Sequence, residues 1–238
     1  MGVNLLARKL QQLSELGIPG PATKIYERIA SKLMVKLHEL AIEQLGLQRE
    51  LCYVLDVGCG PGFLLSKLLA LRNGLIYAVG LDVSPEMVEL ARKRLLSSER
   101  AGVSDVVAGD ATCLPFRSDS FHAIVSTGVL HHINEPRKFF KEMRRVLREG
   151  SSAHILEFSP DTPWSEVKEA SKILGVSPLL LKVVSSMHGI PRKEYIKGHI
   201  KQALTGINCE IRFIKLVTEV KLIKSSQIYE ELPDDRQS

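Results

Sequence analysis

The chain has 238 residues, of which 45% are apolar and 25% are charged. These proportions are ordinary for a soluble globular protein with a full core, and they exclude an intrinsically disordered chain. The net charge of +5 is compatible with an anionic partner such as RNA but does not require one. No apolar run reaches the roughly 18 residues that a membrane span needs, so we expect a soluble protein.

The four cysteines are scattered along the sequence and form no C-x-x-C pair. We therefore expect them to be reduced thiols of a cytoplasmic protein, with no metal site. The first residues lack the apolar stretch of a signal peptide, which agrees with a cytoplasmic location.

Helical spacing of apolar residues predicts two amphipathic helices at the start of the chain, over residues 5–16 and 22–45. The segment Gly17-Ile18-Pro19-Gly20-Pro21 separates them, and Gly46 is placed to end the second. We expect both helices to pack on the core as a cover of residues 1–46.

A buried strand followed by closely spaced glycines comes next. Residues 51–55 are almost wholly apolar, as in a strand buried on both faces of a parallel sheet, and the helical segment 63–71 follows the glycines. Strand, glycine loop and helix is the layout that binds a nucleotide-like ligand. The third glycine, Gly62, comes one residue earlier than in the dinucleotide pattern G-x-G-x-x-G. Asp56, two residues before the first glycine, would repel a pyrophosphate but suits a ligand with an ammonium group.

Strands and helices then alternate, which predicts an α/β fold with right-handed crossovers. Ser84 is expected to cap a helix that starts at Pro85, and Gly150 to end a helix that runs from Pro136 to about residue 147. Strands are predicted over 75–82, 103–108, 121–126 and 153–158. Three short helices are predicted over 164–174, 178–186 and 192–204, then a hairpin of strands over 209–217 and 218–224, then a polar tail.

The run Asp-Val-Gly-Cys-Gly-Pro-Gly from Asp56 to Gly62 resembles motif I of the class I S-adenosylmethionine (SAM)-dependent methyltransferases. From about residue 53 to 158 the chain resembles the small-molecule branch that includes ubiquinone and menaquinone biosynthesis enzymes. The resemblance implies a doubly wound, Rossmann-like sheet of seven strands, mostly parallel with an antiparallel final strand. It also implies one SAM-binding domain over 1–238, divided into the helical cover 1–46, a core over 51–158, a helical insertion over 159–206, the hairpin 207–225 and the tail 226–238.

Two further aspartates lie at the carboxyl ends of strands of the predicted core, Asp82 as the last residue of its strand and Asp110 two residues after its own. Asp82 lies about twenty residues past the glycine loop, where a carboxylate binds ribose hydroxyls; an incidental aspartate at a strand end is the alternative. The resemblance implies that Asp110 holds the adenine amino group and that the Ala111 N–H meets a ring nitrogen, whereas an aspartate bonding its own turn is the alternative. The predicted cofactor-binding residues are Asp56, Gly58, Cys59, Gly60, Gly62, Asp82, Val83, Asp110, Ala111 and Ser126.

His131 and His132 follow the fourth predicted strand, in a loop that faces the methyl-transfer centre in the resembling enzymes. Transfer from a sulfonium is an in-line displacement, so binding both partners in alignment supplies much of the rate. A base is needed only where the acceptor must lose a proton, and a neutral imidazole can take it near pH 7. Purely structural roles for both histidines are the alternative.

Three functions remain open from the sequence. The first is methyl transfer to a small-molecule acceptor held between residues 1–46 and 159–206. The second is an RNA or protein methyltransferase that uses a basic C-terminal surface. The third is a module that binds SAM or a nucleotide without catalysis, or an NAD dehydrogenase. The basic residues in question are Lys182, Arg192, Lys193, Lys197, Lys201, Arg212, Lys215, Lys221 and Lys224.

Overall fold

The computed structural model describes residues 21–46, 52–71, 76–96 and 104–225, and the side chains of the first helix from residue 30 on. The helix predicted over 5–16 and the tail after residue 225 lie outside this part of the chain. Within it, the predicted order of strands and helices is confirmed.

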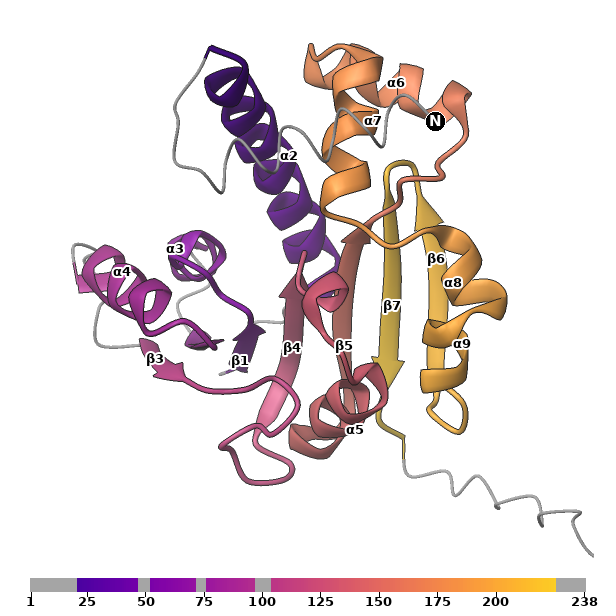
Figure 1. Cartoon of the computed structure of the whole chain (residues 1–238). Coiled ribbons are helices and arrows are strands. Elements are labelled where there is room, and N and C mark those ends of the chain that lie inside the picture. Colours follow the sequence, from indigo (N-terminus) through magenta and orange to yellow (C-terminus); the bar gives the residue numbers. More distant parts are fainter. Residues whose placement is uncertain (1–20, 47–51, 72–75, 97–103, 226–238) are drawn as a thin grey trace, which may run out of the picture.

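A seven-stranded sheet with the order β3-β2-β1-β4-β5-β7-β6 organises the molecule (Figure 1). All neighbouring strands are parallel except β7, which is antiparallel to both β5 and β6. The predicted fold class is thus confirmed, including the antiparallel final strand. The strands are β1 (Cys52–Val57), β2 (Ile76–Asp82), β3 (Ser104–Ala108), β4 (Phe121–Thr127), β5 (Leu147–Phe158), β6 (Cys209–Ile214) and β7 (Val217–Ile223).

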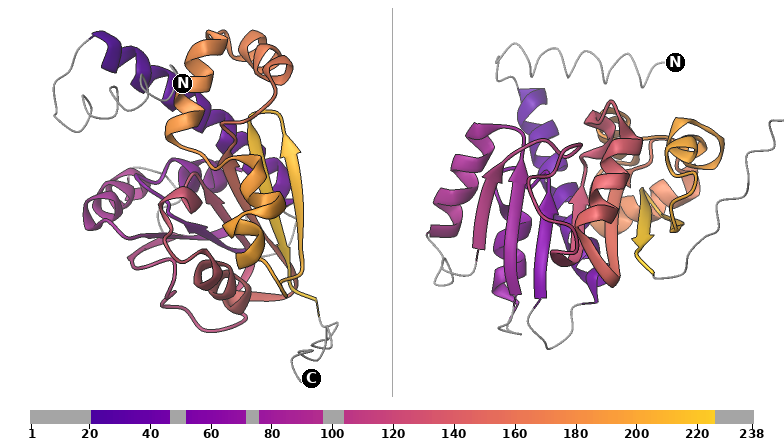
Figure 2. Two further views of the ribbon diagram at one scale, coloured as in Figure 1. Left: turned by 45° about the vertical axis from the view of Figure 1, so that its right-hand side comes forward. Right: turned by 90° about the horizontal axis from the view of Figure 1, so that it is seen from below.

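Helices cover both faces of the sheet (Figure 2). Because successive strand residues point to opposite faces, Val54 packs into one apolar cluster while Leu55 and Val57 pack into the other. The first cluster includes α2 (Pro21–Leu45), α3 (Phe63–Ala70), α4 (Pro85–Leu96), α6 (Trp164–Leu174) and α7 (Pro178–Met187). The second includes α5 (Pro136–Val146), α8 (Arg192–Lys197) and α9 (His199–Ala203).

The strand order reverses between β1 and β4. From β1 the chain goes outward through β2 to β3, and it then returns to β4 on the other side of β1. A crevice opens at the carboxyl ends of parallel strands at such a point, and ligands of doubly wound sheets bind there. The glycine loop leaves β1 at this place. The helix α2 packs against β4, β5 and α7 beside it (Figure 1).

The start of β5 differs from the prediction. The helix α5 ends at Val146 and β5 begins at once with Leu147, so Gly150, expected to end the helix, lies within the strand with a φ of +75°. The register with β4 shifts there, because Phe121 faces Leu147 while Ala123 faces Ser152. Long-range contacts explain the early strand: the Lys224 carbonyl accepts the Gly150 N–H at 2.8 Å.

The third helix of the insertion also differs from the prediction, because it is broken at Gly198 into α8 and α9. A side chain at Gly198 would lie 2.0 Å from the Glu194 carboxylate. That carboxylate instead accepts the His199 backbone N–H at 3.2 Å and lies 2.8 Å from His199 Nδ1. Glu194 thus ends one helix and caps the next.

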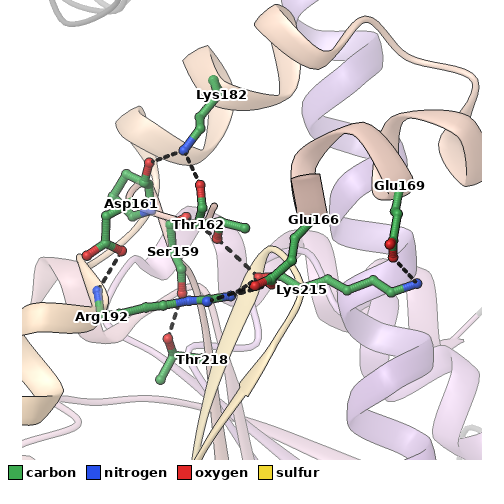
Figure 3. Close-up of polar contacts among 10 residues, drawn as sticks. Ser159, Asp161, Thr162, Glu166, Glu169, Lys182, Arg192, Lys215 and Thr218 are labelled. Carbon is green, nitrogen blue, oxygen red and sulfur yellow. Dashed lines mark hydrogen bonds and ion pairs between the residues drawn. The ribbon is translucent and has the colours of Figure 1, made fainter. Parts of the chain in front are cut away.

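A polar network ties the helical insertion to the sheet (Figure 3). The Lys182 ammonium of α7 donates to the carbonyls of Pro160 and Thr162, at 2.9 and 2.5 Å, just beyond β5. Arg192 of α8 pairs with Glu166 of α6 at 2.8 Å. These contacts fix the insertion over the carboxyl end of β5. In the described part of the chain, no helix is by itself long and apolar enough to cross a membrane; α6 and α7 meet that criterion only as a pair, which is bent by 106°.

Candidate active site

Three cavities lie along the carboxyl edge of the sheet and meet at one side chain, Met34 of α2, which lines all of them. We name them A, B and C, with volumes of about 530, 320 and 270 Å³. Cavity A is also lined by Gly58, Asp82, Val83, Asp110, Ala111 and His132. Cavity B is also lined by His38, Asp56, Gly58, Cys59, Gly60 and Lys67. Cavity C is also lined by Ser31, Gly128, His131, Phe158, Val184 and His188.

The glycine loop needs glycine for two different reasons. Gly58 has a φ of +77°, and a Cβ there would lie 2.2 Å from Val129 Cγ2. Gly62 has a φ of +79°, and a Cβ there would lie 3.1 Å from the Cβ of Ala91 in α4. Gly62 therefore lets α3 pack closely on α4, and it lies outside the linings of the three cavities.

Asp82 holds the glycine loop against the start of α4. Its Oδ2 accepts the Gly60 N–H at 2.8 Å, and its Oδ1 accepts the Ser84 N–H at 2.9 Å. The Ser84 hydroxyl accepts the Met87 N–H at 3.3 Å, as predicted for a helix cap. Each carboxylate oxygen has a second lone pair, so Asp82 can still accept a hydrogen bond from a molecule in cavity A.

Asp56 is a buried carboxyl group without a partner. Its side chain is 1% exposed, and neither oxygen has a hydrogen bond within the described residues. Burial, and then the nearby charge of Asp82, raise the pKa of Asp56 to about 8. A cationic group in cavity B would satisfy this carboxylate. Burial also raises the pKa of the Cys59 thiol well above its ordinary value, which makes it a poor nucleophile.

The Asp110 carboxylate bonds its own turn, which is the alternative given above to a contact with adenine. It accepts the backbone N–H and the hydroxyl of Thr112, at 2.7 and 2.8 Å, and these hydrogen bonds lower its pKa. Asp110 and Ala111 nevertheless both line cavity A. Ser126 is not brought to the cavities. Its buried hydroxyl donates to the Val57 carbonyl at 2.8 Å, and Thr127 after it lines cavities A and B.

The two adjacent histidines serve different cavities. They belong to the short 3-10 helix η2 (Leu130–His132), and their ring centroids are 3.9 Å apart. His132 lines cavity A, and burial followed by the charge of His131 lowers its pKa. His131 lines cavity C, and its Nδ1 lies 2.9 Å from Oε2 of Glu157.

Several residues of the site were missed from the sequence, among them Met34, His38, Lys67, Glu157 and His188. Glu157 had a signal, because a carboxylate in the buried second half of β5 needs a partner. His38 lies on a helix that was predicted to pack on the core and to border the acceptor, but the prediction did not single out this residue. Burial, followed by the charge of Lys67, lowers the pKa of His38 to about 4, so its imidazole is neutral at pH 7.

A family model described as a methyltransferase domain matches residues 55–155, the stretch that holds the glycine loop, Asp82, Asp110 and both histidines. This stretch of the chain is similar to a methyltransferase domain, and the fold around it is the one that class I SAM-dependent methyltransferases share. The cofactor of such methyltransferases is SAM, and the unpartnered Asp56 carboxylate in cavity B fits the ammonium group of that molecule.

The names of the chain's relatives give different methyl acceptors. A demethylmenaquinone methyltransferase of Clavibacter sepedonicus is 37% identical over 56% of this chain and 52% of its own. A ubiquinone/menaquinone biosynthesis C-methyltransferase of Ruegeria is 33% identical over 63% of this chain and 64% of its own. A probable tRNA methyltransferase 9B of Bos taurus is 27% identical over 67% of this chain and 34% of its own. The chain spans about half the length of the curated relatives it matches first.

Solved structures of methyltransferases share the fold. A putative SAM-dependent methyltransferase of Methanococcus maripaludis superposes with a TM-score of 0.64 over 94% of both chains, at 19% identity. A SAM-dependent methyltransferase of Aquifex aeolicus gives a TM-score of 0.59 over 84% of this chain and 97% of its own, at 20% identity. At these identities the likeness concerns the fold alone.

Proposed function

We propose that this chain transfers the methyl group of SAM to a small-molecule acceptor by in-line displacement. One observation carries the proposal: cavities A, B and C converge on Met34, which gives a cofactor and an acceptor adjoining space. The match of residues 55–155 to a methyltransferase domain and the relatives named for quinone methylation support the same reaction class.

In this proposal the adenosine half of SAM occupies cavity A. Asp82 accepts the ribose hydroxyls, Asp110 accepts the adenine amino group, and the Ala111 N–H meets a ring nitrogen. Val83 belongs to the wall of this cavity. Since Asp82 also holds Gly60 and Ser84, the ribose contact and the shape of the glycine loop depend on one carboxylate.

The amino-acid half of SAM then occupies cavity B. Asp56 binds the ammonium group, and Lys67 provides the cation that the carboxylate needs. The neutral His38 lines the same cavity. The loop residues Gly58, Cys59 and Gly60 offer backbone close to the ligand. Gly58 and Thr127 line both cavities, so the sulfonium lies between them, near Met34. The donor carries its own activation, and the protein mainly aligns the two partners.

Contacts of the basic C-terminal residues favour a small acceptor over RNA. Five of the nine are engaged within the protein, which leaves fewer cations to contact phosphates. Lys182 binds two carbonyls, and four others pair with carboxylates (Figure 3 shows three of the five). The four pairs are Arg192–Glu166, Arg212–Glu219, Lys215–Glu169 and Lys224–Asp119.

Two further expectations belong to this proposal. The described elements act as one SAM-binding domain with the boundaries given above, and the protein works in the cytoplasm. In support of a reducing location, Cys59, Cys113 and Cys209 are thiols without a disulfide.

A transfer assay tests the proposed function. Purified protein is incubated with methyl-labelled SAM and a fractionated cell extract, and label is counted in the organic-soluble, RNA and protein fractions. We expect label in the organic-soluble fraction. Label confined to RNA or protein would reject the small-molecule acceptor. SAM binding without label in any fraction would reject catalysis by this chain alone.

A further inference from the structure

We propose, on the basis of the function above, that cavity C receives the methyl acceptor and that His131, held by Glu157, takes a proton from it. The acceptor would then be an uncharged molecule with a weakly acidic hydroxyl group on a small planar ring or double bond, that is, a phenol or an enol. Three observations carry this inference: the bonds of the Glu157–His131 pair, the different positions of the two histidines, and the chemistry of the cavity wall.

The Glu157–His131 pair fixes the imidazole in one form. Glu157 is completely buried, and both of its oxygens are used: Oε1 accepts the Leu130 N–H at 2.5 Å, and Oε2 lies 2.9 Å from His131 Nδ1. A carboxylate only accepts hydrogen bonds, so the proton of a neutral imidazole belongs on Nδ1. The lone pair is then on Nε2, which has no hydrogen-bond partner among the described residues. A nitrogen in this state can accept a proton.

His132 is less suited to the same task. It is the more exposed of the two histidines and lines cavity A, which we assign to adenosine. No carboxylate contact orients its ring within the described residues. His131 lines cavity C, and His188 of the loop after α7 lies across from it at a ring-centroid distance of 5.8 Å. The two histidines that line cavity C are therefore His131 and His188, and the ring of His131 is bonded to a buried carboxylate.

The wall of cavity C indicates an uncharged, flat acceptor. Among its described lining residues there is no Asp, Glu, Lys or Arg, so a charged group in this cavity would lack a counter-ion. Phe158, His131 and His188 contribute aromatic rings. At about 270 Å³ the cavity lies just below the range of about 300–1,000 Å³ typical of pockets for drug-sized ligands, so it suits one ring.

The proposed step balances as follows. The hydroxyl O–H bond of the acceptor breaks, and its proton goes to His131 Nε2. The electron pair released, on oxygen or on a conjugated ring carbon, attacks the methyl group. The S–CH₃ bond breaks, and its electron pair stays on sulfur, so the sulfonium becomes a neutral thioether. When the ring carbon attacks, the proton bound to that carbon then leaves to solvent. His131 returns its proton to the oxygen, which restores the hydroxyl group.

The test compares two matched variants, Glu157→Gln and Glu219→Gln. Glu219 is also fully buried and lies 2.7 Å from a buried histidine, His154, but it is outside the linings of cavities A, B and C. In Glu157→Gln the amide oxygen is needed by the Leu130 N–H, so the amide NH₂ faces His131 and moves its proton to Nε2. Reversal of the tautomer in a hydrolase triad lowers turnover by about 10⁴-fold. We expect a loss of at least about 10²-fold in methyl transfer to the organic-soluble fraction for Glu157→Gln, with unchanged SAM affinity, and little loss for Glu219→Gln. Equal activities of the two variants would overturn the inference.

A spectroscopic measurement keeps this inference distinct from the proposed function. Nitrogen NMR of histidine-labelled protein, with His131→Gln to assign the signal, reports which ring nitrogen carries the proton. We expect Nδ1–H in the unmodified protein and Nε2–H in Glu157→Gln. The unchanged tautomer in Glu157→Gln would overturn the inference even if methyl transfer is found. The expected tautomers with no methyl transfer to any fraction would reject the proposed function instead.

The acceptor class is tested with phenol and benzoate as probes, in the presence of S-adenosylhomocysteine. The two probes share a ring and differ in charge. We expect phenol to bind and benzoate to bind at least about tenfold more weakly, because a carboxylate in cavity C has no counter-ion. Val184→Phe, which fills the cavity, should abolish phenol binding. Binding of benzoate as tight as that of phenol, or no binding of phenol, would overturn this part of the inference.

Discussion

Asp56 and Asp82 stand at the carboxyl ends of the neighbouring strands β1 and β2, and the charge of Asp82 adds to burial in raising the pKa of Asp56 to about 8. Asp82 has two backbone partners, whereas Asp56 has none within the described residues. The two carboxylates therefore respond differently to pH and to a bound cation.

The pH dependence of stability should report the state of Asp56. An unfolded aspartate has a pKa of about 3.9, so between roughly pH 4 and pH 8 the folded protein holds a proton that the unfolded chain has lost. The stabilisation of the folded protein by this proton is complete below about pH 4. As the pH rises to about 8 it is lost, and the free energy of unfolding falls by about 1.4 kcal/mol per pH unit. Asn has no such proton, so Asp56→Asn should gain stability relative to the unmodified protein as pH rises. Urea unfolding at pH 5 and pH 8 without SAM measures this difference, and a difference independent of pH would contradict it.

Loss of the Asp82 charge should weaken SAM binding. Asn at this position keeps one acceptor oxygen, so it cannot serve Gly60, Ser84 and the ribose as the carboxylate does. A hydrogen bond to a charged group is worth about 1.5–3 kcal/mol, so we expect SAM affinity to fall about 10- to 100-fold in Asp82→Asn. Calorimetric titration measures it. Asp105→Asn on β3 is the control, because Asp105 bonds the Tyr77 hydroxyl outside the cavities; equal losses would argue against a ribose contact.

Space beside the glycine loop can be tested by adding one methyl group. Gly58→Ala places a Cβ against Val129 at a backbone angle that also strains alanine. Gly206→Ala has the same strain, with a φ of +74°, but nothing lies within 4 Å of its Cβ. We expect Gly58→Ala to be less stable than Gly206→Ala by about 1–3 kcal/mol, the cost of overpacking. Thermal unfolding compares the two, and equal stability would mean that Val129 moves aside freely.

The assignment of the amino-acid half of SAM to cavity B predicts a ligand-dependent effect of Lys67. Lys67→Met should weaken binding of S-adenosylhomocysteine about 10-fold or more, because an ionic hydrogen bond to its carboxylate is lost. Binding of 5′-methylthioadenosine, which lacks that half, should not change. Lys36→Met is the matched control, since Lys36 and Lys67 both pair with Glu39 but Lys36 is outside the lining of cavity B. A similar loss of affinity for both ligands would mean that the carboxylate of S-adenosylhomocysteine does not bind at Lys67.

Local patterns were sufficient to predict most of the fold. The run from β1 through the glycine loop to α4 depends on contacts close in sequence, such as the Ser84 cap, and its boundaries agree to within a residue or two. The start of β5 and the break at Gly198 depend on partners that a pattern does not reveal. For β5 the partner is Lys224, far along the chain; for Gly198 it is the side chain of Glu194.

The same distinction applies to the site. Asp82 and Asp110 follow strands and could be placed from their positions alone. The partner of His131 could not, because Glu157 is 26 residues away in the buried second half of β5, and the pairing of β4 with β5 brings the two together. Ser126 was predicted to bind the cofactor, but its hydroxyl bonds to the neighbouring strand. The next residue, Thr127, lines the cavity instead, so a difference of one position in the strand decides which side chain reaches it.

The position of Met34 has a consequence for the order of events in a catalytic cycle. A methionine side chain rotates about three bonds and adapts to what surrounds it. Since this one thioether forms part of the wall of cavities A, B and C, any rotamer that enlarges one compartment takes space from another. With the cofactor in cavities A and B and the acceptor in cavity C, as proposed, the two ligands would be thermodynamically linked through this side chain, and the linkage would be reciprocal. A mutation at Met34 would change the cooperativity between the two ligands without removing a polar contact to either.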